Sequence, residues 1–88
     1  MPLFIRSIVL TGPQAEVDAE LPGHLEQLRT LRAAGQLRIA GAFPNGGGFL
    51  EIFEAADLLE AERIARASPL VVEGLGAWTI RRWEELEL

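Results

Sequence analysis

Three residue types are missing from this 88-residue sequence: cysteine, lysine and tyrosine. Without cysteine there can be no disulfide framework, thiolate zinc site or cysteine nucleophile. The absence of lysine excludes a Schiff base, and the absence of tyrosine excludes a phenolic acid. One histidine and two aspartates give no credible metal cluster. We therefore predict no metal and no cofactor, and few side chains remain for catalysis.

Positive charge and long hydrophobic runs are also scarce. The net charge is −5, and the eight positive side chains are all arginines scattered along the chain. A nucleic-acid-binding module normally concentrates a basic excess on one face. No apolar run approaches the ~20 residues of a membrane span, and the first residues do not resemble a signal peptide. We predict no nucleic-acid partner, no membrane contact and a cytoplasmic location.

The remaining composition, 49% hydrophobic and 24% charged, is that of a globular protein. The length fits one domain over residues 1–88. Because so short a chain builds only a thin core, self-association is a reasonable expectation.

The spacing of apolar residues and the positions of proline, glycine and capping residues define the expected helices and strands. Leucines at 21, 25, 28 and 31 form one stripe of a helix over 18–34, with Pro22 in its first turn and Gly35 after its end. Asp57 can cap a second helix over 58–67 through the backbone of Glu60. Strands are expected over 3–10, 37–43, 48–54 and 77–83, with a loop over 70–76.

This order, β-α-β-β-α-β, predicts an α+β ferredoxin-like sandwich with an antiparallel sheet of strand order 2-3-1-4. Strand parity divides the side chains between two faces of the sheet. We expect one apolar face under the helices, with the following residues: Leu3, Ile5, Ser7, Val9, Leu37, Ile39, Leu50, Ile52, Trp78 and Ile80.

The other face is expected to mix aromatic and charged residues, among them Phe4, Arg6, Arg38, Glu51 and Arg81. Four aromatics on a solvent face would be unusual, so we predict that this face forms a homodimer and lines a cavity. Alternatively, the charges simply pair across strands near the sheet edges.

The order of features resembles the YCII-related (YciI-like) family along nearly the whole chain. The matching stretches are residues 23–25 with Leu28 and Leu31, then 34–37, 41–43, the glycine-rich hairpin, 61–63, 68–71, 74–75 and 80–83. The resemblance implies a dimeric α+β barrel.

In that family a histidine early in the first helix and an aspartate before a proline look like a catalytic pair. His24 matches the histidine, whereas Ser68 stands at the aspartate position. The resemblance therefore implies a site of His24 and Ser68, and we expect the two within reach of each other at the mouth of a pocket. A lone histidine on a helix edge is otherwise more often structural.

Three functions remain open. The first is general acid/base chemistry of the lyase or isomerase type on a small organic acid, with His24 as the proton shuttle and Arg6, Arg38 or Arg81 holding the carboxylate beside Glu51. The second is a binding or regulatory domain for a small anionic ligand. The third is a purely structural dimer.

Overall fold

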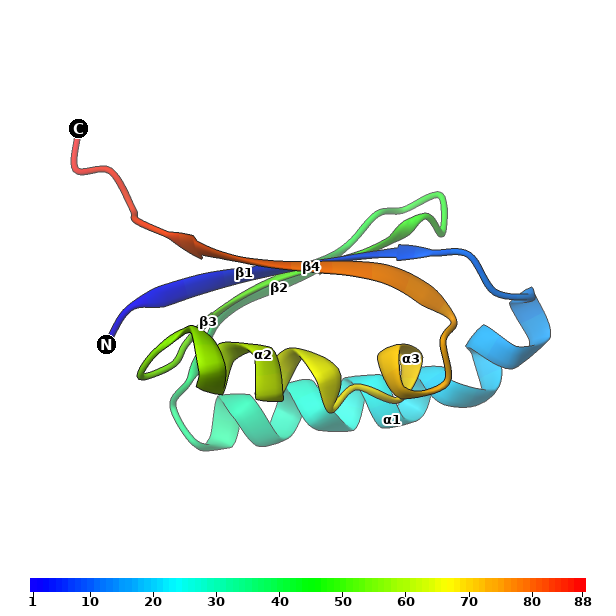
Figure 1. Cartoon of the computed structure of the whole chain (residues 1–88). Helices are drawn as coiled ribbons and strands as arrows, with labels where there is room; N and C mark the ends of the chain where they lie inside the picture. Colours follow the sequence, from blue (N-terminus) through cyan, green and yellow to red (C-terminus); the bar gives the residue numbers. More distant parts are fainter.

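The computed structural model describes residues 1–88 and has four strands and three helices. Their bounds are β1 Leu3–Leu10, α1 Gln14–Ala33, β2 Leu37–Ala42, β3 Gly48–Glu54, α2 Leu58–Arg66, α3 Pro69–Val72 and β4 Gly76–Trp83. The strands form one antiparallel sheet in the order β2-β3-β1-β4. This confirms the predicted α+β topology. All helices lie on one side of the sheet (Figure 1), and none combines the length and hydrophobicity needed to cross a membrane.

The first helix begins four residues earlier than predicted. Val17, which is buried, extends the leucine stripe by one turn toward the N-terminus. Pro13 precedes the first helical residue with an extended backbone conformation. Pro22 is therefore an interior residue of α1 rather than a first-turn residue, and it has no N–H to offer the preceding turn. The end of the helix is as predicted, since Gly35 has a φ of 75°.

The second helix confirms its predicted cap, because the backbone N–H of Glu60 donates to Asp57 Oδ1 at 2.9 Å. The segment after it differs from the predicted loop. Pro69–Val72 forms the short helix α3, whose N-cap is Ser68 and whose first residue is Pro69. Proline suits that position because the first helical N–H has no partner within the helix.

The predicted assignment of the two sheet faces is wrong for most residues. Along β1 the buried side chains are those of Phe4, Arg6 and Ile8, and these lie under the helices. The aromatic and charged face is therefore the interior of the protein. The predicted homodimer contact through that face is wrong as well, because the helices of the same chain cover it.

A bulge in β2 is a second reason why the sheet faces differ from the prediction. Leu37 pairs with Phe53, but Ile39 pairs with Ile52, so one extra residue, Arg38, interrupts the register. Leu37 packs with the buried core around Phe53, whereas Ile39 is exposed on the opposite side. After the bulge, each side chain of β2 therefore lies on the face opposite to the one that simple alternation from Leu37 predicts.

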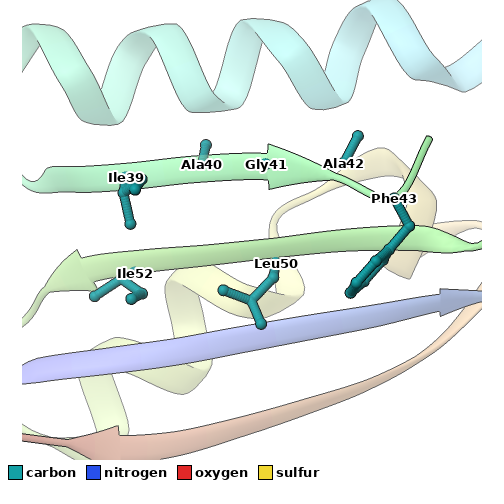
Figure 2. Close-up of a pocket in the computed structure, with 7 residues that line it drawn as sticks. All are labelled: Ile39, Ala40, Gly41, Ala42, Phe43, Leu50 and Ile52. Carbon is teal, nitrogen blue, oxygen red and sulfur yellow. The ribbon is translucent and has the colours of Figure 1, made fainter.

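The side of the sheet without helices, here called the open face, is largely apolar. Its side chains include those of Leu3, Ile5, Val9, Ile39, Phe43, Leu50 and Ile52. A hollow of about 370 Å³ lies over β2 and β3 on this face. Figure 2 shows Ile39, Phe43, Leu50 and Ile52 lying together around it. No helix lies over this side of the sheet (Figure 1).

Candidate functional site

Arg6 lies at the centre of the candidate site. Its side chain extends from β1 toward the helices and is completely buried. Its Nε donates to Glu51 Oε1 at 2.6 Å, and its Nη1 donates to Gln27 Oε1 at 3.0 Å and to the carbonyl oxygen of Ala65 at 3.1 Å. Only Nη2 has no hydrogen-bond partner. Arg6 therefore joins the sheet to both long helices and keeps one donor group free.

Glu51 faces Arg6 because the two residues are directly paired between β3 and β1. Its second oxygen, Oε2, lies 3.2 Å from His24 Nε2. A carboxylate accepts hydrogen bonds, so this contact places the imidazole hydrogen on Nε2 when the ring is neutral. Phe49, two residues before Glu51 and on the same side of β3, packs against the ring with a centroid separation of 4.8 Å.

His24 uses its other ring nitrogen to contact Ser68. Nδ1 lies 2.7 Å from Ser68 Oγ, and because Nε2 carries the hydrogen, Nδ1 accepts from the hydroxyl group. Ser68 Oγ in turn accepts from the backbone N–H of Leu70 at 3.2 Å as the cap of α3. We call the four side chains Arg6, Glu51, His24 and Ser68 the buried relay, since each has zero exposed surface.

Close helix packing brings His24 to Ser68. A Cβ atom added to Gly23 would lie only 2.7 Å from Pro69 Cγ, so α1 approaches the start of α3 where it has no side chain. His24 is the next residue along α1, and Ser68 precedes Pro69. The Gly23–His24 and Ser68–Pro69 pairs thus pack and hydrogen-bond as one unit.

Arg6 of the buried relay and its neighbour Gln27 also bind the end of α2. The last carbonyl groups of a helix have no partner within it. Here the carbonyl of Ala65 accepts from Arg6, and that of Ile64 accepts from Gln27 Nε2 at 2.7 Å as well as from the backbone N–H of Ala67 at 3.2 Å. Gln27 was missed in the sequence analysis. The signal that could have identified Gln27 is its position one turn after His24, which places both side chains on the same side of α1.

The structure brings together four of the six side chains considered for the site. Arg38 is half exposed and lies near Glu54 and Glu85, at 3.5 and 3.8 Å. Arg81 is exposed on β4 and pairs with Ile5 of the open face.

The expected contact between His24 and Ser68 is confirmed, but His24 is fully buried and lines none of the main surface hollows. The expected position at a pocket mouth is therefore wrong.

The arrangement permits a defined set of proton movements. Arg6 and Glu51 carry opposite charges, and a neutral His24 adds none, so the buried relay is electrically balanced. A hydrogen can pass between Ser68 Oγ and His24 Nδ1, because these two atoms lie 2.7 Å apart. No group of three histidine, aspartate or glutamate side chains lies close enough to hold a metal ion.

Comparisons with solved structures identify related folds. A 5-chloro-2-hydroxyhydroquinone dehydrochlorinase from Burkholderia phenoliruptrix AC1100, solved in complex with 2,5-dihydroxybenzoquinone, is 21% identical with a TM-score of 0.78 over 93% of each chain. An antibiotic biosynthesis monooxygenase is 15% identical with a TM-score of 0.64, over 99% of this chain and 100% of the other. No curated protein matches the sequence.

The family comparison covers nearly the whole chain. Residues 6–84 match the YCII-related domain, a range that includes every member of the buried relay. The chain belongs to the YCII-related domain family.

Proposed function

We propose that this domain is a small-molecule enzyme that performs general acid/base chemistry of the lyase or isomerase type on a small organic acid. The observation that carries the proposal is the hydrogen-bonded line from Ser68 through His24 to Glu51, with distances of 2.7 and 3.2 Å. A base must be oriented and its charged form stabilised. Ser68 and Glu51 fix the two ring nitrogens of His24 in that way.

In this proposal Ser68 passes the proton between substrate and histidine. A substrate proton moves to Ser68 Oγ while the hydroxyl hydrogen of Ser68 moves to His24 Nδ1. The reverse transfer returns a proton to a different position of the substrate, so the reaction needs no other reactant. Arg6 Nη2, the buried donor without a partner, would hold an oxygen atom of the substrate. The dehydrochlorinase with the same fold supports a small oxygenated organic molecule as the ligand class.

Proton exchange tests this function directly. With small oxo acids such as pyruvate and 4-oxopentanoate in D₂O, the parent protein should catalyse deuterium incorporation beside the carbonyl group. His24→Ala should lower that rate about 10²-fold or more, because a positioned acid/base group typically contributes 10²–10⁴-fold. Proton NMR of the probes measures the exchange, with Arg63→Ala on the exposed surface of α2 as a control. Equal rates for parent and His24→Ala would contradict the proposal.

The complete burial of the relay favours a second candidate, a ligand-binding or structural domain without catalysis. In that case Arg6, Glu51 and His24 hold the sheet against the helices and move no proton. Crystals soaked with 2,5-dihydroxybenzoquinone distinguish binding from a purely structural role. Ordered ligand beside His24 without any exchange activity would favour the binding domain.

We further propose that the chain forms a homodimer through the open face. Exposed fractions of 56% for Val9, 58% for Ile39 and 51% for Phe43 leave a broad apolar surface in a single copy. Monomeric soluble proteins rarely expose contiguous patches of this kind. A two-fold axis would place the open face against itself, so that each copy covers the hollow of the other.

Charge placed on the open face should disrupt this dimer. Sedimentation of the parent protein at micromolar concentration should give about twice the 9.6 kDa of one chain. Ile39→Glu should sediment as a monomer, because two-fold symmetry would bury two carboxylates together. Leu59→Glu, at a 67% exposed position of α2, should leave the dimer intact. A parent protein that sediments as a monomer would overturn the proposed assembly.

A further inference from the structure

The buried relay has no spare positive charge for the carboxylate of an organic acid. The charge of Arg6 is already matched by Glu51, and its one free donor, Nη2, can bind an uncharged oxygen such as a carbonyl. A carboxylate added there would leave a net negative charge in the interior, which is costly. Arg38 pairs with Glu54 and Glu85, and Arg81 lies on the opposite face of the sheet.

A groove between α1 and β2 offers the missing positive charge. It has a volume of about 250 Å³ and is lined by Leu25, Leu28, Arg29, Arg32, Leu37 and Ala40. The leucines provide apolar walls and the two arginines provide guanidinium groups. Arg32 forms no ion pair. Arg29 contacts Glu26 at 3.3 Å, but both side chains are about two-thirds exposed, so this pair is weak and can be exchanged for a ligand.

The groove is adjacent to the buried relay. Ala40 is directly paired with Glu51, and Glu51 is directly paired with Arg6, so the three residues form one row across the sheet. Neighbouring strands are ~5 Å apart. On the other wall, Leu28 follows His24 by one helical turn. Ala40 has a small side chain and is exposed, so the groove opens to solvent one strand away from Glu51.

We infer that this groove is a carboxylate-binding subsite in which Arg29 and Arg32 hold the acid group of the substrate. The inference rests on the proposed function, because it assigns the two ends of the same substrate. The carboxylate stays at the rim of the groove, where water and two guanidinium groups stabilise it. The uncharged, reacting end extends toward Arg6 and Ser68.

Benzoate and benzamide are suitable probes because they share an apolar ring and differ in charge. In a titration followed by amide NMR, benzoate should shift the signals of Leu25, Leu28 and Ala40, and benzamide should bind about tenfold more weakly. Arg32→Gln should weaken benzoate binding about threefold to tenfold, as expected for losing one charge-assisted contact at a partly exposed site. Arg63→Gln, an exposed arginine of α2 without an ion pair, should bind benzoate like the parent.

Three results would overturn the subsite: equal affinity for benzoate and benzamide, equal losses for Arg32→Gln and Arg63→Gln, or benzoate shifts spread over the other arginines. His24→Ala separates this inference from the proposed reaction. It should lower the rate of deuterium exchange about 10²-fold or more while leaving benzoate binding unchanged. Benzoate binding in the groove without deuterium exchange by the parent would support the subsite and contradict the reaction. Deuterium exchange without benzoate binding in the groove would support the reaction and contradict the subsite.

Discussion

Replacing Glu51 by leucine should lower the free energy of unfolding by about 3–5 kcal/mol, because it leaves the guanidinium of Arg6 buried without its counter-charge. The Arg6–Glu51 pair has no exposed surface on either side chain. Glu51→Leu also removes the acceptor of His24 Nε2. Urea unfolding followed by fluorescence of Trp78 and Trp83 measures the change. Because a dimer makes stability depend on concentration, all variants need the same protein concentration.

A double variant tests whether the loss comes from the unpaired charge. Arg6→Met with Glu51→Leu should recover part of the stability, since replacing both members of a buried ion pair by apolar residues is often neutral. Recovery should be incomplete because Arg6 also bonds Gln27 and the carbonyl of Ala65. Arg38→Met, which removes the partly exposed contacts with Glu54 and Glu85, should cost less than ~1 kcal/mol. An equal effect of Glu51→Leu and Arg38→Met would show that the Arg6–Glu51 pair is not buried in solution.

The buried relay suggests how this chain manages with serine at position 68. The family resemblance implies an aspartate there, next to the histidine. Here the neutral hydroxyl of Ser68 contacts His24 Nδ1, and the carboxylate of Glu51 contacts Nε2. The negative charge is therefore on the other side of the ring. The imidazole ring of His24 thus keeps a contact with one carboxylate although position 68 holds a serine.

Local sequence signals were sufficient for the four strands, the two longer helices and their order, but not for the short helix α3. The helix over the leucine stripe, its end at Gly35 and the Asp57 cap depend on contacts within a few residues, and the structure confirms these three features. Of the four leucines in the stripe, however, only Leu31 is buried, and Leu25 is 37% exposed. The start of α1 was missed because Pro22 was assigned to the first turn of the helix, which placed the beginning at residue 18 instead of Gln14. Proline 22 is exposed on the outer side of the helix, where its ring is accommodated by solvent.

The sheet faces could not be assigned from local signals. Both sides of β1 are apolar apart from Arg6 and Ser7, so alternation alone does not decide which side is buried. Arg6 and Glu51 suggested contact with water because the sequence does not show that their charges cancel across neighbouring strands. The bulge at Arg38 added a further error, since it turns Ile39 away from the side that Leu37 faces. Only the three-dimensional pairing of residues 45 positions apart explains why this charged face is the interior.

The register that brings Glu51 opposite Arg6 begins at Gly48. Gly48 pairs with Val9 and has a φ of 152°, a conformation that L residues rarely adopt. A Cβ atom at this position would overlap the carbonyl oxygen of Ile8. The backbone of β1 cannot move away without breaking its pairing with β3 and β4. Glycine is therefore required here by both conformation and space.

Gly48→Ala should consequently lower the free energy of unfolding by more than about 4 kcal/mol, the range reached when a substitution meets a named steric or backbone conflict. Gly47→Ala is a matched control one residue earlier, because its nearest neighbour would be Asn45 Oδ1 at 3.6 Å and its φ is not positive. That variant should stay within ~0.5 kcal/mol of the parent in urea unfolding. Because Glu51 follows Gly48 in the same strand, any folded Gly48→Ala protein should also shift the NMR signals of His24. Near-parent stability of Gly48→Ala, with unchanged His24 signals, would show that the β1–β3 register does not depend on this glycine.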